Sequence, residues 1–190
     1  MASPTRALNL SSLRGFMMLL VASMASIALV GCDEKTSSDV ATVKIKGQTF
    51  HLEIAADPDK RYLGLGKRKT IEDDGGMIFV FPPADIRVQS FLMRDCETDI
   101  DIIYLDGSGR VLSMHHMPKE PPRNTETEKA DDPKMDEAYH ARLPKYSSRF
   151  PSQIVIELKG GKLEELTSKY GLKESDKVDL DVEALKKLAR

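Results

Sequence analysis

The chain has 190 residues, of which 41% are hydrophobic and 31% charged, and its formal net charge at pH 7 is −2. A nucleic-acid-binding protein usually carries a clear basic excess, so this balance gives no support for a nucleic-acid partner. The two cysteines, Cys32 and Cys96, are too few for a disulfide scaffold.

Residues 1–31 have the pattern of a secretory signal peptide. Arg6 and Arg14 form a short basic region, and a largely apolar stretch follows from Phe16 to Val30. This stretch is too short for a comfortable membrane span, which needs about 20 residues. The stretch runs into Leu29-Val30-Gly31-Cys32, which resembles the lipobox of bacterial lipoproteins.

The lipobox resemblance implies that Cys32 becomes the new N-terminus and carries a lipid that anchors the protein to a membrane. A plain secretory signal with a chance cysteine is the alternative interpretation. Residues 32–40 then form a polar tether. We therefore expect a membrane-anchored lipoprotein of the cell envelope, facing the periplasm or the exterior.

The first half of the domain predicts several strands and one short helix. Residues 43–45 and 50–54 alternate apolar and polar side chains around a tight turn at Gly47-Gln48, as half-buried strands of a hairpin do. Asp57-Pro58 is typical of a helix start, and the helix is predicted to end near Leu65. A continuous apolar run at 77–81 predicts a further strand, which Pro82-Pro83 ends.

The second half predicts strands at 88–96, 99–105, 110–115, 153–158 and 177–180, and helices at 163–170 and 182–190. Residues 118–149 are polar, contain five prolines and show no periodicity. We interpret them as a long surface excursion, a kind of segment that is usually functional or disordered.

Short strands at regular spacing favour a mainly β fold, a compact β-sandwich or jelly-roll-like single domain over residues 41–190 with two or three short helices. A doubly wound α/β sheet is disfavoured because helices do not alternate with strands.

Four segments resemble the domain-of-unknown-function 192 family of uncharacterised bacterial and archaeal proteins. The family patterns are Gly-Leu-Met-x-Arg, Gly-Met-Leu-Phe-x-Phe, Phe-Trp-Met-Lys-Asn-Thr with Pro-Leu-Asp-Ile-Ile-Phe-Leu-Asp, and Leu-Glu-Leu-x-x-Gly. The matching segments are residues 64–68, 76–81, 91–96 with 99–106, and 156–161. The resemblance implies a jelly-roll-type β-sandwich and no particular reaction.

The chain departs from the family pattern at five positions. They are Gly66 for Met, Leu92 for Trp, Asp95 for Asn, Cys96 for Thr and Asp99 for Pro. If the Trp or the Asn-Thr pair serves a shared ligand, this chain has lost or altered that site.

Asp101 is the most informative polar position. In a strand it shares a face with Ile103 and Leu105, so its carboxylate is expected to be buried and to need a partner. Arg68 and Arg94 are the candidates, because both occupy basic positions of the family pattern. Either Asp101 and one of these arginines form a structural ion pair, or the three residues are part of a ligand-binding site.

Other reactive residues give weaker signals. Cys96 lies in a predicted strand. The nearby Arg94 would favour its thiolate form, whereas the negative charges of Asp95 and Glu97 would oppose it. The adjacent His115 and His116 should point to opposite faces of a strand, which does not suit one metal ion. We predict no catalytic constellation, no metal site and no cofactor.

These features predict a non-catalytic binding module for a small ligand or an envelope partner, anchored to the membrane through Cys32. The competing hypothesis is a hydrolase of an envelope polymer in which Asp99 and Asp101 act as an acid-base pair, since residues at a spacing of two share a strand face.

Overall fold

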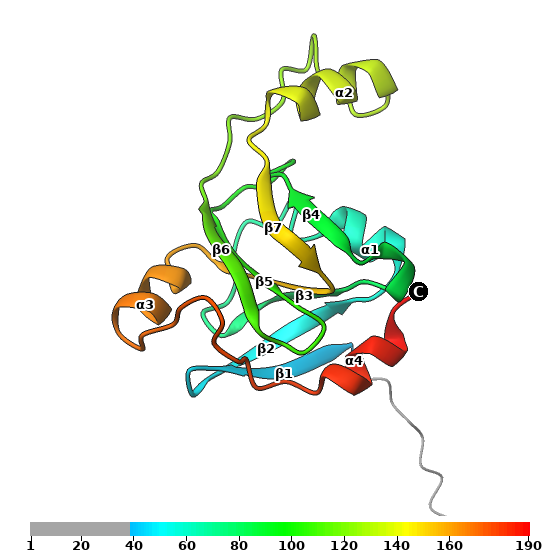
Figure 1. Ribbon diagram of the computed structural model, residues 1–190. Helices are drawn as coiled ribbons and strands as arrows, with labels where there is room; N and C mark the ends of the chain where they lie inside the picture. Colours follow the sequence, from blue (N-terminus) through cyan, green and yellow to red (C-terminus); the bar gives the residue numbers. More distant parts are fainter. Residues whose placement is uncertain (1–38) are drawn as a thin grey trace, which may run out of the picture. The chain divides into compact units, whose positions relative to one another are not determined.

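The core of the protein is a six-stranded mixed sheet in the order β1-β2-β3-β8-β5-β6, accompanied by a two-stranded sheet of β4 and β7 (Figure 1). The computed structural model describes residues 39–190. The predicted signal peptide, the lipidation site Cys32 and nearly all of the tether lie outside these residues. The described part contains eight strands, a short 3-10 helix η1 and four α-helices, which are β1 (Val40–Ile45), β2 (Gln48–Ala55), α1 (Pro58–Leu63), β3 (Gly75–Val80), η1 (Pro83–Asp85), β4 (Arg87–Phe91), β5 (Ile100–Leu105), β6 (Val111–Met117), α2 (Pro133–Arg142), β7 (Tyr146–Ser152), β8 (Ile154–Lys159), α3 (Lys162–Ser168) and α4 (Val182–Leu188).

The central strands of the main sheet are buried on both faces. Every residue of β5 is buried, and so are residues 154–158 of β8. Side chains of one face, such as Ile103 and Ile156, join a cluster with Leu166 of α3 and Leu185 of α4. The other face belongs to a second cluster that lies towards α1 and the β4–β7 sheet.

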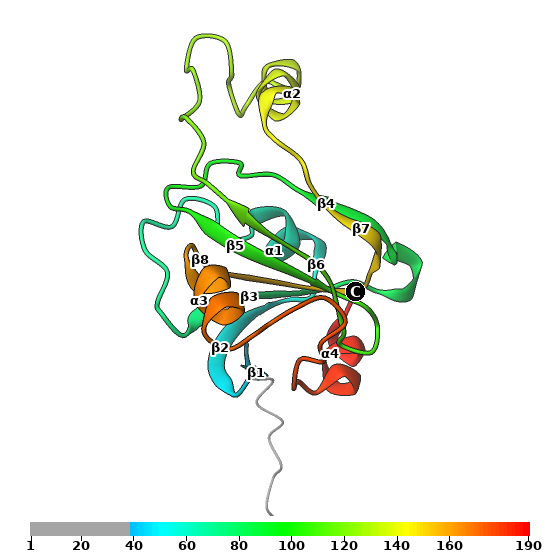
Figure 2. The same cartoon turned by 60° about the vertical axis from the view of Figure 1, so that its left-hand side comes forward.

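Figures 1 and 2 show this layering, with α3 and α4 on one side of the main sheet and α1 on the other. The expected mainly β fold in a single domain is confirmed. None of the helices in residues 39–190 combines the length and the apolar character that a membrane crossing requires.

The predicted strand pattern is correct for most of the chain, and three expectations are wrong. Residues 118–149 are not without regular structure, because they contain α2 and the start of β7. Cys96 does not lie in a strand, because β4 ends at Phe91 and a turn follows. Residues 177–180 form single bridges, to Lys44 and Arg110, instead of a strand.

Helix α2 stands away from the main sheet at the end of the excursion (Figures 1 and 2). The sequence of α2 lacks an apolar stripe, and Tyr139 is the one residue of this helix that is buried. Its start nevertheless follows the same rule as α1, because the Asp132 side chain caps the helix and Pro133 occupies the first turn. Arg123 holds the helix to the domain by pairing with both Asp95 and Asp136.

Candidate ligand-binding site

Glu157 is a carboxyl group in the middle of the sheet. It lies in β8, opposite Met77 of β3 on one side and Ile102 of β5 on the other. The residue is 5% exposed, and within residues 39–190 its Oε2 atom is buried without a hydrogen-bond partner. An unsatisfied buried polar group costs about 1–3 kcal/mol, so the position calls for an explanation.

Burial raises the pKa of Glu157 to about 8, and the backbone amide of Leu65 opposes this shift only in part. The group is therefore largely a neutral carboxylic acid at pH 7. Three other buried side chains, Arg123, Asp136 and His140, also hold an atom without a hydrogen bond in the described part of the chain. Those three face one another as ion pairs at 2.6 and 3.6 Å, which Glu157 does not.

A small cavity of about 60 Å³ adjoins the Glu157 side chain, and we call it the inner cavity. Phe79 and Phe91 contribute its aromatic walls, with ring centroids 5.0 Å apart in an edge-to-face contact. Gly64 leaves space there, because a Cβ atom at this position would lie 3.7 Å from Glu157 Oε2 and 3.5 Å from the Phe79 ring. The further lining residues are Arg61, Tyr62, Leu63, Leu65, Gly66, Leu92, Arg94 and Cys96.

A larger cavity of about 490 Å³ lies beside the inner one, between α1 and β4, and we call it the groove. The two share five lining residues, so they adjoin. The shared residues are Arg61, Tyr62, Phe91, Leu92 and Arg94. A ligand held in the groove would therefore have the Glu157 carboxyl at its deep end.

Arg94 stands at the junction of the groove and the inner cavity. Its guanidinium lies 3.8 Å from the centroid of the Tyr62 ring, and its Nη2 donates to the Tyr62 carbonyl at 2.7 Å. Among the described residues, no carboxylate pairs with it. The planar cation is thus held in position while most of its donors remain available.

Arg61 has a structural role by contrast. Its donors are taken up by the carbonyls of Ala56, Val80 and Arg190, at 2.7–3.0 Å. These bonds tie α1 to the end of β3 and to the chain end after α4, and so fix one wall of the groove.

Cys96 lines the inner cavity as a thiol and not as a thiolate. Burial, together with the negative charges of Glu157 and Asp95, raises its pKa to about 12. A protonated thiol is a poor nucleophile. Its position therefore supports a lining role and gives no support for covalent catalysis.

The structure does not bring Asp101 together with Arg68 or Arg94, so the expected arginine partner is wrong. Asp101 accepts from His116 Nδ1 at 2.7 Å and from the Leu163 amide at 2.6 Å, and it is fully buried. Arg68 makes a forked pair with Glu53 instead. Of the three residues predicted for ligand binding, only Arg94 lines the groove as the structure describes it, and its role there remains a prediction.

Asp99 and Asp101 both approach His116 but differ in setting. The Asp99 side chain is half exposed, lies 4.0 Å from His116 Nε2 and accepts from the Lys119 amide. Because both Asp101 oxygens are engaged and its side chain is 1% exposed, this geometry gives no support for an acid-base pair working on a polymer.

His115 and His116 point to opposite faces, as expected of neighbours in a strand. His115 contacts the Ser147 carbonyl on the β7 side, whereas His116 contacts Asp101. Within residues 39–190, no three His, Cys, Asp or Glu side chains gather in a way that could hold a metal ion.

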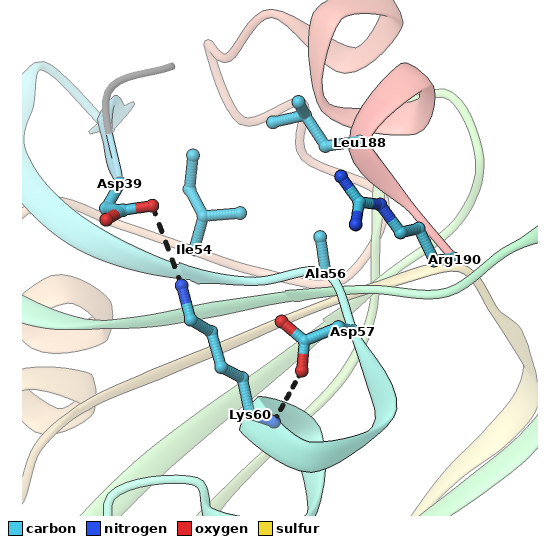
Figure 3. Close-up of a pocket in the computed structure, with 7 residues that line it drawn as sticks. All are labelled: Asp39, Ile54, Ala56, Asp57, Lys60, Leu188 and Arg190. Atoms are coloured by element: carbon cyan, nitrogen blue, oxygen red, sulfur yellow. Dashed lines mark hydrogen bonds and ion pairs between the residues drawn. The ribbon is translucent and has the colours of Figure 1, made fainter. Parts of the chain in front are cut away.

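Another cavity, of about 250 Å³, lies between the start of α1 and the end of α4 (Figure 3). Three of its charged groups already serve the fold. Asp57 caps α1 by accepting from the Lys60 amide at 2.9 Å, and the Lys60 ammonium pairs with Asp39 at 3.6 Å. We therefore favour the groove and its inner cavity as the functional site.

Comparison with known proteins adds to this geometry. Residues 41–180 match the DUF192 family, described as "Uncharacterized ACR". All four segments that resemble the family's patterns line the inner cavity. The lining residues among them are residues 64–66, Phe79, Phe91, Leu92, Arg94, Cys96 and Glu157. Three of the departures from the pattern, at Gly66, Leu92 and Cys96, also lie there.

Solved structures of similar fold include a protein of unknown function from Novosphingobium aromaticivorans DSM 12444. It is 24% identical, with a TM-score of 0.53 and coverage of 74% of this chain and 83% of that one. A protein from Sinorhizobium meliloti 1021, described as a candidate transcription regulator, is 22% identical, with a TM-score of 0.52 and coverage of 74% and 91%. Among curated proteins no match is found. These likenesses concern the fold alone.

Glu157 was missed as a site residue by sequence reasoning. It follows three apolar residues, Ile154 to Ile156, and precedes Leu158, which would suit the polar face of a half-buried strand equally well. The one available signal was its place in the fourth family segment.

Replacement of Asp101 with alanine should lower the free energy of unfolding by about 1–3 kcal/mol, because the Leu163 amide and the His116 ring each lose their acceptor. Urea unfolding at pH 7 measures this. Asp99→Ala is the matched control, since its carboxylate is half exposed, and equal losses in the two variants would refute the structural role of Asp101.

The raised pKa of Glu157 predicts that stability falls with rising pH. An unfolded glutamate titrates near about 4.3 and the folded one at about 8, so between these values the folded state binds more protons. The free energy of unfolding should therefore lose up to about 1.4 kcal/mol per pH unit in this window and level off above pH 8.

Urea unfolding between pH 5 and pH 8 checks this slope. Glu157→Gln should remove that part of the slope. Glu53→Gln should keep it, because Arg68 lowers the pKa of Glu53 and moves its titration below the window. An unchanged slope in Glu157→Gln would contradict the assignment.

Proposed function

The chain belongs to the DUF192 family, and we propose that it is a cell-envelope lipoprotein whose β domain binds a small ligand in the groove between α1 and β4. Glu157 contacts the ligand at the deep end and Arg94 at the junction with the groove. The proposed action is binding without catalysis.

One observation carries the proposal. Four segments that are far apart in the sequence and resemble the family's patterns meet around a single cavity, next to a carboxyl group that has no partner for its Oε2 within residues 39–190. A fold that needed these residues only for packing would place apolar side chains around a filled space. Convergent polar groups in a largely apolar pocket are typical of a ligand site.

The departures from the family pattern support a ligand that differs between members. Gly66 and Leu92 stand where the pattern has the larger Met and Trp, and both line the inner cavity. The smaller Leu92 leaves more room in the inner cavity, whereas a Cβ atom at Gly66 would lie 3.1–3.2 Å from the backbone carbonyls of Leu63 and Arg94, so this glycine allows a close backbone approach. The altered site thus fits a change of ligand better than a loss of binding.

Binding is favoured over catalysis because the groups of the site are not poised for bond breaking. The Cys96 thiol is protonated, Asp101 is engaged elsewhere, and Arg61 is committed to carbonyls. The pKa of Glu157 is close to neutral pH, but among the described residues no second carboxyl group and no histidine lines the inner cavity.

A fluorescence experiment tests ligand binding. The chain contains no tryptophan, so Tyr62→Trp places a single reporter in the groove while keeping an aromatic ring beside Arg94. We expect at least one compound from a panel of amino acids, sugars, nucleotides and cell-wall fragments to change its emission in a saturable way. Glu157→Gln in the same background should weaken that compound at least tenfold.

Val88→Trp is the control for this experiment. Val88 lies in β4 and is half exposed, but it does not line the groove. An emission change that both reporters share would indicate non-specific binding, and a panel without effect on Tyr62→Trp would argue against a small ligand and direct attention to an envelope protein as the partner.

The proposed lipidation of Cys32 leads to a separate prediction. Full-length protein expressed in a bacterium should enter the detergent phase of a Triton X-114 partition and incorporate labelled palmitate. Cys32→Ser should lose the label, whereas Cys96→Ser, which removes the other cysteine of the chain, should keep it. Label retained in Cys32→Ser would exclude Cys32 as the lipidation site.

A further inference from the structure

We infer that the ligand is a small zwitterion, whose protonated amine enters the inner cavity beside Glu157 and whose carboxylate pairs with Arg94. This inference rests on the proposed binding function and names the chemical class of its ligand. Amino acids and their ω-amino analogues are the simplest members of the class.

The inner cavity suits an ammonium group. Its polar end is the Glu157 carboxyl, which is 5% exposed and, in the part of the chain that the structure describes, lacks a partner for Oε2. The faces and edges of Phe79 and Phe91 form its sides. A carboxylate together with aromatic rings is the usual setting in which proteins hold an amine cation. The volume of about 60 Å³ leaves room for an amine and the carbon that carries it.

Arg94 suits a carboxylate at the other end. The Tyr62 ring and the Tyr62 carbonyl hold the guanidinium in place. Its Nε and Nη1 have no acceptor among residues 39–190. Two parallel N–H donors on a fixed plane match the two oxygens of a carboxylate.

The arrangement of the two charges selects a molecule that carries both. Glu157 and Arg94 line the same inner cavity, yet within the described residues they do not form an ion pair. A simple amine would leave Arg94 without a counter-ion, and a simple carboxylic acid would leave Glu157 Oε2 without a partner. A zwitterion of matching length gives Arg94 its counter-ion and Glu157 a cation beside which it can ionise.

The other ionisable groups around Glu157 do not compete for this role. The Cys96 thiol and the Tyr104 phenol both have raised pKa values because they are buried near Glu157, so they are neutral at pH 7. The Arg61 guanidinium is held by three carbonyls. Entry of an amine cation therefore acts on Glu157 itself and should drive it to ionise.

The test is isothermal titration of the full-length chain in detergent at pH 7 in phosphate buffer, with proton release followed in parallel by a pH indicator in weakly buffered solution. The probes are glycine, β-alanine and 4-aminobutyrate, with propylamine and propionate as the amine-only and carboxylate-only controls. We expect one of the zwitterions to bind at least tenfold more tightly than either control. Its binding should release close to one proton, because a group with a pKa of about 8 is mostly protonated at pH 7 and ionises when it meets the cation.

Variants separate the two contacts. Glu157→Gln should abolish the proton release and weaken the zwitterion at least tenfold. Arg94→Leu should reduce zwitterion affinity to the level of propylamine and leave propylamine unchanged, and Arg94→Lys should restore part of the loss. Arg87→Leu is the matched control, because Arg87 lines the groove but not the inner cavity and lies 3.8 Å from Asp85.

Three results would overturn the inference. If propionate binds as tightly as the zwitterions and no proton is released, then Glu157 serves as a neutral hydrogen-bond donor. If no zwitterion binds while a sugar or a nucleotide changes the Tyr62→Trp emission, the ligand class is wrong although the groove is still a binding site. A Tyr62→Trp protein that responds to no compound would instead refute the proposed function together with the inference.

Discussion

The structure depends on one constraint, which is that its central strands β5 and β8 are covered on both faces. Along these strands apolar side chains alternate between two hydrophobic clusters, and any carboxyl group placed there is removed from water. Two such groups occur, Asp101 in β5 and Glu157 in β8. The way in which each one is accommodated separates the structural part of the molecule from the candidate site.

Asp101 faces the side of the sheet covered by α3, where it accepts hydrogen bonds from the Leu163 amide in the first turn of that helix and from the ring of His116 in the next strand. Both bonds replace the lost water, and the amide bond also orients α3 on the sheet. Glu157 faces the other side, where the chain around Gly64 and Gly66 passes close by without supplying a hydrogen-bond donor to Oε2 from the described residues. The same fold thus satisfies one buried carboxyl fully and leaves the other beside a cavity.

The sequence predicts those parts of this arrangement that depend on residues close together in the chain. Period-two alternation is local, so it identifies the strands and the burial of Asp101. The partner of Asp101 was not within reach, because a bulge between Tyr104 and Leu105 shifts the register of the hairpin by one residue and so places Asp101 opposite His116 instead of His115. The arginine assignment failed because it used family position without strand register.

Other features need contacts that no local pattern reports. Helix α2 has its Asp-Pro start but no apolar stripe, since it rests on the domain through Arg123 and the ring of Tyr139 instead of a hydrophobic face. The burial of Glu157 depends on the loop after α1 lying over β8, and these segments are about ninety residues apart in the chain. The groove is a product of tertiary packing, and only the shared family segments point to it from the sequence.

The candidate site is preformed for the binding that we propose. Arg61 fixes α1 with three hydrogen bonds to carbonyls, Tyr62 holds the plane of Arg94, and the central strands hold Glu157, so few side chains need to be ordered on binding. The folded domain already bears the cost of desolvating the Glu157 carboxyl, and this cost appears as its raised pKa. In the binding mode that we propose, a cation that enters the inner cavity relieves that cost without a movement of the backbone. The proposal thus makes the stability lost at the central strand available as affinity and selectivity for the ligand.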